Sequence, residues 1–447
     1  MAASLPDATT NGRGFVLASL VGAVGLAMVL VASRDPVVAL VGLVALLVLA
    51  VACFRVEAAL LLLVATTPLE AAVDLGGALS ITKLAGGLCF ASFAFNAIAT
   101  RRVVRLDRSH AVIFAILAIA LLSTLGAEDI GLALSTTVRY ASYAGLYLVV
   151  TQFAGDHDAL RRIAWALSIS SAVAGLLAIQ GFVSGQYVLA RLPYGDPNDL
   201  AYILATTLPL TLWLLRPTRP SRRPLVLLLV AVIGAAVLLS FSRGALLGLV
   251  AGLAWHAFTE RRHLLVLLVG GAVTLLVMLV FVNTNRSQVE IGLQQKQSIA
   301  SYNVNSRLDA WSAAARLAAD RPAFGIGPGN FRLKYVEATG RPEGSIGLAV
   351  VHNAYLDVAA EVGVLALVLF VTYLVMVLLR LTSARRHAVG PPGLAAALRT
   401  AFVIAVVSAV TLSEQYYAPF WLLGGMATAV WCERQTSPAS ARADDGD

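Results

Sequence analysis

The stretch that decides the fold is LVLLLVAVIGAAVLLSFSRGALLGLVAGLAWHAF, residues 225–258. As one helix these 34 residues would extend about 50 Å, whereas about 20 residues cross the hydrocarbon core of a bilayer. Basic segments flank the run on both sides, RPTRPSRR at 216–223 and TERRH at 259–263. Because arginine-rich loops gather on one side of a membrane, the run must cross it twice. The sequence therefore predicts a helical hairpin that reverses near Ser242, Arg243 and Gly244, where glycine eases the turn.

The rest of the chain has the same character. Of its 447 residues 59% are hydrophobic and 13% charged, and the mean hydropathy is +0.81. A soluble domain would carry about 25% charged residues. We predict an all-α, polytopic integral membrane protein with about 12 to 14 transmembrane helices. The candidate spans are 14–32, 36–53, 57–70, 79–98, 110–127, 133–152, 160–181, 199–215, 224–241, 243–258, 263–282, 362–381, 394–412 and 418–432.

The arginine clusters orient these spans. The segments 100–110, 216–223, 259–263 and 380–387 are basic and alternate with poorly charged loops, so we place them in the cytoplasm. The net charge of +8 then reflects topology and not nucleic-acid binding. The predicted organisation is a cytoplasmic N-terminus (1–13), transmembrane helices (14–282), an external loop subdomain (283–361), C-terminal transmembrane helices (362–432) and a disordered cytoplasmic tail (433–447).

This orientation collects the unusual polar side chains on the outer side. They are Lys83, Arg139, Arg191, Arg243, Arg307 and His352. Lys83 and Arg139 lie near span ends, where a cation can equally well extend to lipid head groups. Arg243 is different, because a charge in the middle of an apolar run is costly without a partner. In GDPND (195–199), Pro197 and Asn198 are also consistent with a simple helix start.

Two further segments belong to the outer side. The residues from His352 to Leu381 would extend about 45 Å as one helix, so its first turns are predicted to stand outside the membrane. They carry a polar stripe of Asn353, Asp357 and Glu361 at four-residue spacing. The external loop is predicted to contain an amphipathic helix. One side of it carries Leu308, Trp311, Ala315 and Ala318.

These side chains suit chemistry on an anionic, lipid-linked substrate. Arginine binds phosphate bidentately and keeps its charge, and a neutral histidine can take a proton from an attacking hydroxyl. Together they fit displacement of a lipid diphosphate from a sugar. Asp196 and Asp199 are the only close carboxylate pair on the outer side, and we expect neither a metal nor a cofactor.

At these residues the chain resembles the O-antigen ligase and O-antigen polymerase superfamily of bacterial envelope glycosyltransferases. The resemblance rests on SFSRGALLGLVAGLAW (240–255), SRLDAWSAAARLAADRPAFGIGPGNF (306–331) and HNAYLDVAAEVGVLAL (352–367), preceded by YGDPNDLAYIL (194–204). It covers about residues 190 to 430. It implies a metal-independent, inverting transferase of the GT-C type, multi-pass in the bacterial inner membrane, that uses an undecaprenyl-diphosphate-linked glycan on the periplasmic face.

The resemblance also implies roles for individual residues. Arg191 and Arg243 would hold the diphosphate, and His352 would serve the acceptor hydroxyl. Asn353 and Arg307 would contact substrate, and Asn198 lies in the family's asparagine-containing block.

The acceptor stays open at this point. A ligase of lipopolysaccharide biosynthesis would use lipid A-core or another glycan acceptor, and a polymerase would use a second lipid-linked repeat. A third branch glycosylates serine or threonine in proteins. A transporter of lipid-linked glycans is a different class, but transporters place their polar sites near the midplane, whereas these residues gather at the outer rim.

Overall fold

The computed structural model describes residues 55–73, 80–101, 103–153, 155–260, 282–339 and 350–436. Within these residues every regular element is helical, which confirms the all-α class. The predicted N-terminus, the spans 14–32 and 36–53, nearly all of the span 263–282 and most of the tail lie outside the described residues. The predicted total of 12 to 14 spans therefore stays a prediction.

Four of the described helices are long and apolar enough to cross a bilayer. They are α4 (Ile81–Ala99), α7 (His157–Val183), α9 (Arg223–Leu239) with the short turn before it, and α15 (Val364–Arg386). Two shorter apolar helices are α5 (Arg108–Thr124) and α16 (Leu394–Ser408). The same bundle contains α3 (Val56–Thr66), η1 (Thr67–Ala72), α6 (Ile130–Thr151), α8 (Pro197–Trp213), α10 (Arg243–Thr259), η5 (Glu414–Tyr416) and α17 (Ala418–Thr436). These helices make the chain a multi-pass membrane protein.

The predicted hairpin is present, with a different turn. The helix α9 ends at Leu239 and α10 begins at Arg243, with the Ser242 hydroxyl accepting the Ala245 N–H at 3.5 Å. The left-handed residue of the turn is Phe241, with φ of 51°, so the turn role predicted for Gly244 is wrong. Gly244 instead lies in α10, where a Cβ would come 2.5 Å from the Thr411 hydroxyl.

The predicted basic segments meet at one end of the bundle, which we call the basic end. There Arg380 pairs with Asp107 at 2.5 Å, and Arg385 pairs with Glu260. The indole of Trp213, just before the basic segment 216–223, donates to the carbonyl of Pro392 at 3.1 Å, which joins that segment to the same end. Segments far apart in the sequence are thus brought together as the arginine pattern predicts.

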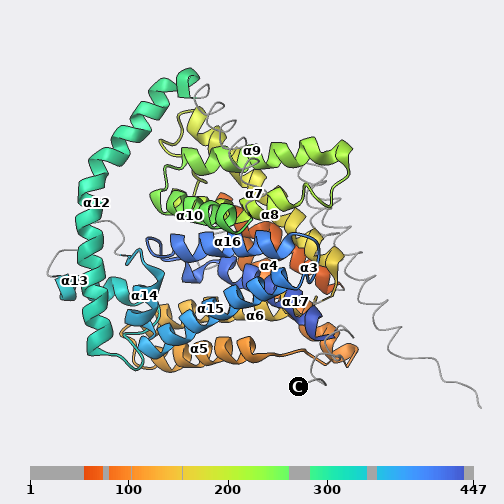
Figure 1. Ribbon diagram of the computed structural model, residues 1–447. Helices are drawn as coiled ribbons and strands as arrows, with labels where there is room; N and C mark the ends of the chain where they lie inside the picture. The colour runs from red at the N-terminus through yellow and green to blue at the C-terminus, as the bar shows by residue number, and fades with distance from the viewer. Residues whose placement is uncertain are drawn as a thin grey trace, which may run out of the picture.

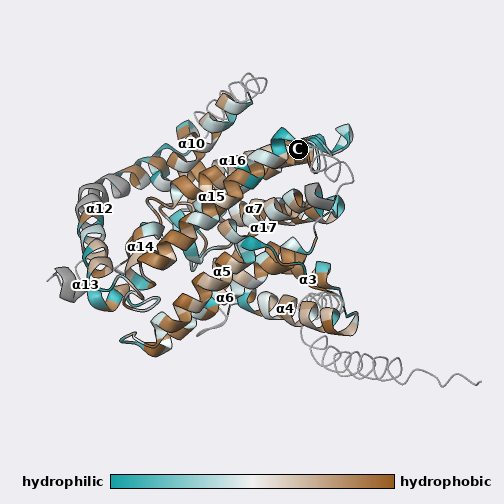
Figure 2. Cartoon of the chain, turned by 60° about the horizontal axis from the view of Figure 1, so that its bottom comes forward, coloured by the Kyte–Doolittle hydropathy of each residue, from teal (hydrophilic) through white to brown (hydrophobic). Residues whose placement is uncertain are grey.

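At the opposite end, called the outer end here, α12 (Arg286–Asp320) crosses the helix ends (Figure 1). Its 35 residues correspond to about 50 Å. In Figure 2 the bundle helices α5, α15 and α16 are largely hydrophobic, whereas α12 has a mixed surface. The chain continues through α13 (Phe331–Thr339) and α14 (Ala354–Glu361). That this segment stands outside the membrane stays a prediction.

The α12–α14 segment has a small hydrophobic core of its own. The core joins Ala310, Ala313 and Ala314 of α12 to Phe331 and Tyr335 of α13, together with Ile326, Val351 and Ala360. Leu308 is 55% exposed and Ala315 is exposed as well, so the predicted apolar side of this helix is wrong at both. The buried side of α12 carries Ala310 and Ala314 instead, because α14 packs against these residues.

The single helix predicted from His352 to Leu381 is also wrong. The chain forms α14, breaks at Gly363 and resumes as α15. Gly363 has φ of 105°, and a Cβ there would lie 2.5 Å from the carbonyl oxygen of Ala323. The Val364 N–H donates to the Pro322 carbonyl at 2.8 Å. The loop after α12 therefore occupies the position that a continuous helix would need.

Candidate functional site

His352 stands at the outer end, directly before α14. Its φ is 52°, a left-handed conformation that is strained for a residue with a side chain. Asn353 follows as the N-cap of α14, and its side-chain oxygen accepts the N–H groups of Tyr355 and Leu356 at 3.0 and 3.1 Å. The Ala354 N–H bonds the carbonyl oxygens at the end of α16, Ala409 at 2.9 Å among them. The backbone that follows His352 is thus fixed.

The imidazole of His352 lies among charges from two other elements, α12 and α8. Burial and, to a lesser extent, the charge of Arg307 lower its pKa to about 4, and the charge of Asp196 opposes them. The pKa of Arg307 is itself lowered by burial and by Arg243, and Asp196 raises it. His352, Arg307, Arg243 and Asp196 therefore form one electrostatic group, which we call the histidine–arginine group. Its histidine is neutral at pH 7.

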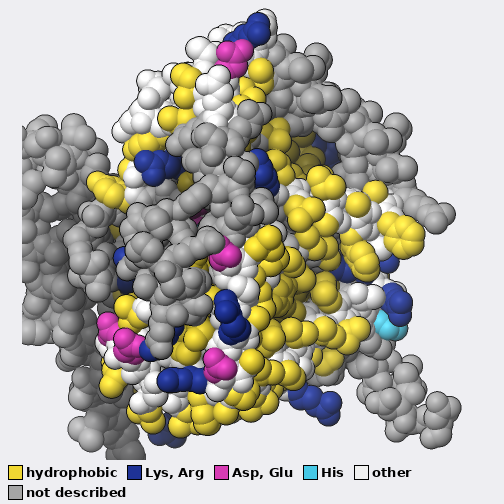
Figure 3. Space-filling model, turned by 90° about the vertical axis from the view of Figure 1, so that its left-hand side faces the viewer, with side chains coloured by type: hydrophobic (Ala, Val, Ile, Leu, Met, Phe, Trp, Pro, Cys, Tyr) yellow, Lys and Arg dark blue, Asp and Glu magenta, His cyan; other side chains and the backbone are white. Residues whose placement is uncertain are grey.

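The helices explain why these side chains converge. Arg243 is the first residue of α10, just after the hairpin turn, and Arg307 lies on the part of α12 that crosses the outer end. Asp196 is the N-cap of α8 and accepts the Asn198 N–H at 2.6 Å. Figure 3 views the side of the molecule where α12 runs, and lysine, arginine and acidic side chains are interspersed there among hydrophobic ones.

Three other predicted residues have local partners. The guanidinium of Arg191 stacks on the ring of Tyr187, 4.7 Å from its centre. Asn198 lies in the first turn of α8, where its backbone is part of the cap. Asn353 uses its side-chain oxygen to cap α14. Local structure explains the side-chain geometry of Arg191 and Asn353 and the backbone of Asn198, and a contact with substrate stays a prediction for each.

Lys83 and Arg139 line a cavity of about 580 Å³ at the outer end. The cavity lies between η1, α4, α6 and α8, and Asp196 and Asp199 line it as well. Because Asp196 also acts on the pKa of His352, the cavity adjoins the histidine–arginine group. Lys83 and Arg139 are thus separated from Arg243 and Arg307, but the cavity that they line is next to the histidine–arginine group.

Glu361 belongs to the polar stripe predicted to stand outside the membrane, but this side chain is buried, with 3% of its surface exposed. Its carboxylate accepts the N–H groups of Gly329 and Phe331, at 2.7 and 3.1 Å, and the hydroxyl of Tyr416. It therefore holds the turn GIGPGNF (325–331) against α14. Asp357 is buried too and accepts the side-chain amide of Gln415 at 2.8 Å. The four-residue spacing correctly predicted that Asp357 and Glu361 share one side of a helix. The prediction that this side stands outside the membrane did not include their burial by other parts of the protein.

Glu414 is a buried acid that sequence reasoning missed. Burial raises its pKa well above the usual range, and the neighbouring Asp199 and Asp196 raise it further. It lies in η5, between α16 and α17, in a stretch whose only signal is its polarity between two spans. Three carboxyl groups thus meet at the start of α8.

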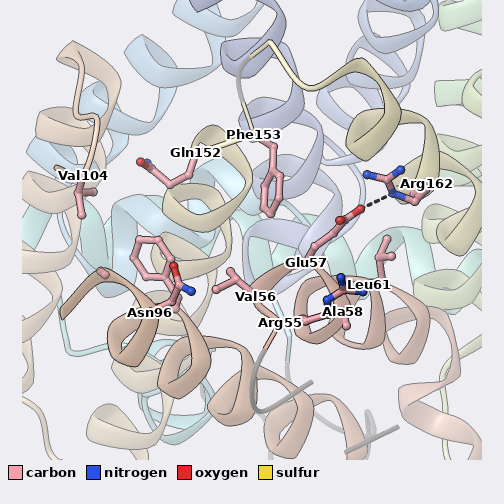
Figure 4. A pocket seen from close by; sticks show the side chains of 12 residues that line it. Arg55, Val56, Glu57, Ala58, Leu61, Asn96, Val104, Gln152, Phe153 and Arg162 are labelled. Carbon is pink, nitrogen blue, oxygen red and sulfur yellow. Dashed lines mark hydrogen bonds and ion pairs between the residues drawn. The ribbon is translucent and has the colours of Figure 1, made fainter. Parts of the chain in front are cut away.

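A second cavity, of about 620 Å³, lies at the basic end (Figure 4). It is lined by the starts of α3 and α7 and the ends of α4 and α6, and Glu57 and Arg162 form an ion pair across it. None of the predicted site residues lines this cavity.

Comparison with known proteins gives one finding on the family. A family model described as O-antigen ligase matches residues 227–371. The match runs from α9 into α15 and includes Arg243, Arg307 and His352. No curated protein matches the chain. The fold and this match together define a multi-pass, all-helical membrane protein with a glycosyltransferase-type domain. The match to the O-antigen ligase family covers residues 227–371, and there it confirms the resemblance found in the sequence.

Proposed function

We propose that this protein transfers a saccharide from a polyprenyl diphosphate, such as undecaprenyl diphosphate, to an acceptor hydroxyl at the periplasmic face of the inner membrane. The observation that supports this most directly is the histidine–arginine group. A neutral imidazole lies with two guanidinium groups, all three within the matched region. Such a set combines a proton acceptor with two fixed cations for a phosphate leaving group.

In the proposed reaction the acceptor oxygen attacks the anomeric carbon from the face opposite the diphosphate, so the configuration inverts. The bond from that carbon to the diphosphate oxygen breaks, and the lipid diphosphate leaves with its electron pair. The acceptor proton goes to His352. Arg243 and Arg307 stabilise the charge that develops on the leaving oxygen.

Donor binding would also adjust the base. The pKa of His352 is low partly because of the charge of Arg307. A bound diphosphate would neutralise that charge and raise the pKa toward the working pH, where a general base is most effective. The imidazole would thus become a good base only when the donor is in place.

Transfer by the reconstituted full-length protein tests this function. The donor is an undecaprenyl-diphosphate-linked oligosaccharide, EDTA is present, and the acceptors are lipid A-core and a second lipid-linked repeat in separate reactions. We expect His352→Ala to lower the rate about a hundredfold to ten-thousandfold, and Arg243→Ala about a hundredfold or more. Arg316→Ala, at an exposed position of α12, is the matched control. Equal rates in all variants would overturn the proposed function, and the acceptor that reacts decides between ligase and polymerase.

A further inference from the structure

The cavity at the outer end has the dimensions of a ligand site. Its volume of about 580 Å³ falls within the range of about 300–1,000 Å³ usual for small-molecule pockets. The apolar lining residues Leu63, Phe90 and Leu146 lie farther from the outer ends of their helices than the polar ones. The cavity thus has an apolar floor and a polar mouth at the outer end.

The polar lining does not suit a second diphosphate. Glu70, Asp196 and Asp199 contribute carboxyl groups, against the two cations Lys83 and Arg139. Glu414 adds a further buried acid close to Asp196 and Asp199. A multiply charged anion would meet more acids than cations here. The histidine–arginine group, with two arginines near one aspartate, is the better anion site.

A ligand rich in hydroxyl groups can form hydrogen bonds with both the acidic and the basic side chains of this lining. Carboxylates accept hydrogen bonds from hydroxyl groups, and Lys83 and Arg139 donate to their oxygen atoms. The Tyr417 hydroxyl donates to one oxygen of Asp199, which fixes the carboxylate and leaves its other oxygen as an acceptor. Glu70 is held in a similar way by the Ser80 hydroxyl at 3.0 Å.

Tyrosine rings complete the lining with flat surfaces. The four tyrosines are Tyr143, Tyr194, Tyr416 and Tyr417. An aromatic ring offers an apolar face with a polar edge, which matches the C–H face and the hydroxyl rim of a sugar. Tyr194 is 65% exposed, so it stands at the mouth, and its N–H is bound to the Ala71 carbonyl at 3.0 Å.

We propose that this cavity binds the sugar residue next to the reacting bond, and that it selects uncharged or amino sugars over uronic acids. Asp196 connects it to the reaction, because this residue lines the cavity and also acts on His352 and Arg307. A lipid-linked saccharide would place its diphosphate at the arginines and its first sugar in the cavity. The identity of the ligand as a donor sugar rests on the proposed function.

Binding of free sugars to the full-length protein in detergent tests this without any transfer reaction. The probes are glucose, glucosamine and glucuronic acid, followed by saturation-transfer NMR. We expect signals for glucose and glucosamine and at least tenfold weaker binding of glucuronic acid, because the acid would face Asp199 and Asp196. Asp199→Asn should weaken glucosamine binding about tenfold and reduce the discrimination against glucuronic acid. Tyr194→Ala, at a position that is 65% exposed, should weaken glucose binding about two- to tenfold.

Asp320→Asn, at an exposed position at the end of α12, is the control and should bind as the wild type does. Glucuronic acid binding as well as glucose would overturn the proposal and make the cavity an anion site. Unchanged sugar binding in both Asp199→Asn and Tyr194→Ala would overturn it too. Since His352 does not line the cavity, His352→Ala should keep the sugar preference. A failed transfer assay with an intact sugar preference would therefore overturn the proposed function alone.

Discussion

The indole N–H of Trp311 donates a hydrogen bond to the carbonyl oxygen of Val351, 3.0 Å away. This bond ties α12 to the residue directly before His352, and so links the element that carries Arg307 to the strained backbone of the histidine. The bond thus connects the backbone beside His352 to the helix that carries Arg307.

Trp311→Phe removes this hydrogen bond but keeps most of the buried ring. A net hydrogen bond is worth about 0.5–1.5 kcal/mol, so we expect kcat to fall about two- to tenfold while KM for the donor changes little. Steady-state transfer kinetics measure both. Trp255→Phe, on an exposed part of α10, is the matched control. An unchanged kcat in Trp311→Phe would show that the bond does not position His352.

The pH dependence of transfer should follow the charges around His352. Its pKa of about 4 in the free protein means that the imidazole stays neutral as the pH falls from 8 to 5. We expect kcat/KM to show no inflection from this group in that range and to fall only near pH 4, when the base becomes protonated.

Two substitutions should move this acid limb in opposite directions. Arg307→Gln removes a charge that lowers the pKa of His352, so the limb should move to higher pH. Asp196→Asn removes a charge that raises the pKa, so the limb should move to lower pH. Profiles of kcat/KM between about pH 3 and 9 measure both shifts. Shifts in the same direction, or none, would contradict the electrostatic grouping of these residues.

Glu361 should make stability depend on pH. Burial and the neighbouring Asp357 raise the pKa of its carboxyl to about 8, above the value of about 4.3 in an unfolded chain. Between these values the folded state holds a proton that the unfolded state has lost, so stability falls as the pH rises from about 5 to 8 and levels off above that. Below the unfolded value this contribution is fully present.

Thermal unfolding in detergent across this range, monitored by tryptophan fluorescence, measures the effect. We expect Glu361→Gln, which does not titrate, to show a smaller fall of Tm with pH than the wild type. Asp357, whose pKa is raised to about 6 by burial, contributes its own fall and remains in the variant. Equal slopes in the two proteins would contradict the role given to Glu361.

The sequence predicts the helices well wherever one apolar run makes one span. The spans 110–127, 133–152 and 160–181 correspond to α5, α6 and α7 within a few residues. The hairpin at 225–258 follows from length and charge alone. The break at Gly363 could not be predicted in this way, because glycine is common in membrane helices and the break depends on contacts with Ala323 and Pro322.

In the candidate site, too, single residues could be predicted from the sequence, whereas features that depend on packing between helices could not. Arg243, Arg307 and His352 could be selected because a cation or a histidine beside apolar runs needs a reason. The cavity with Glu70, Asp199 and Tyr417 depends on how η1, α4, α6 and α8 pack, and no local spacing reports that. The burial of Glu361 and Asp357 likewise depends on the turn 325–331 and on η5 covering them.

Packing of α10 against α16 gives a last prediction, since it fixes the helix that starts with Arg243. Gly248 faces α16 so closely that a Cβ would lie 2.1 Å from the Ser408 hydroxyl and 2.7 Å from the Ile404 carbonyl oxygen. Small residues let membrane helices approach in this way. Gly248→Ala must push the two helices apart, and we expect a loss of about 1–3 kcal/mol in stability.

Gly234→Ala is the matched control, because no atom of the described residues outside its own helix lies within 4 Å of a Cβ at Gly234 on α9. There alanine should be neutral or stabilise by about 0.4–1 kcal/mol, through reduced entropy of the unfolded chain. Thermal unfolding in detergent compares the two variants. If Gly248→Ala also lowers transfer more than its loss of folded protein explains, the displaced α10 has moved Arg243 away from His352. Equal stability of both variants would contradict the close packing of α10 against α16, in which a Cβ at Gly248 would lie 2.1 Å from the Ser408 hydroxyl.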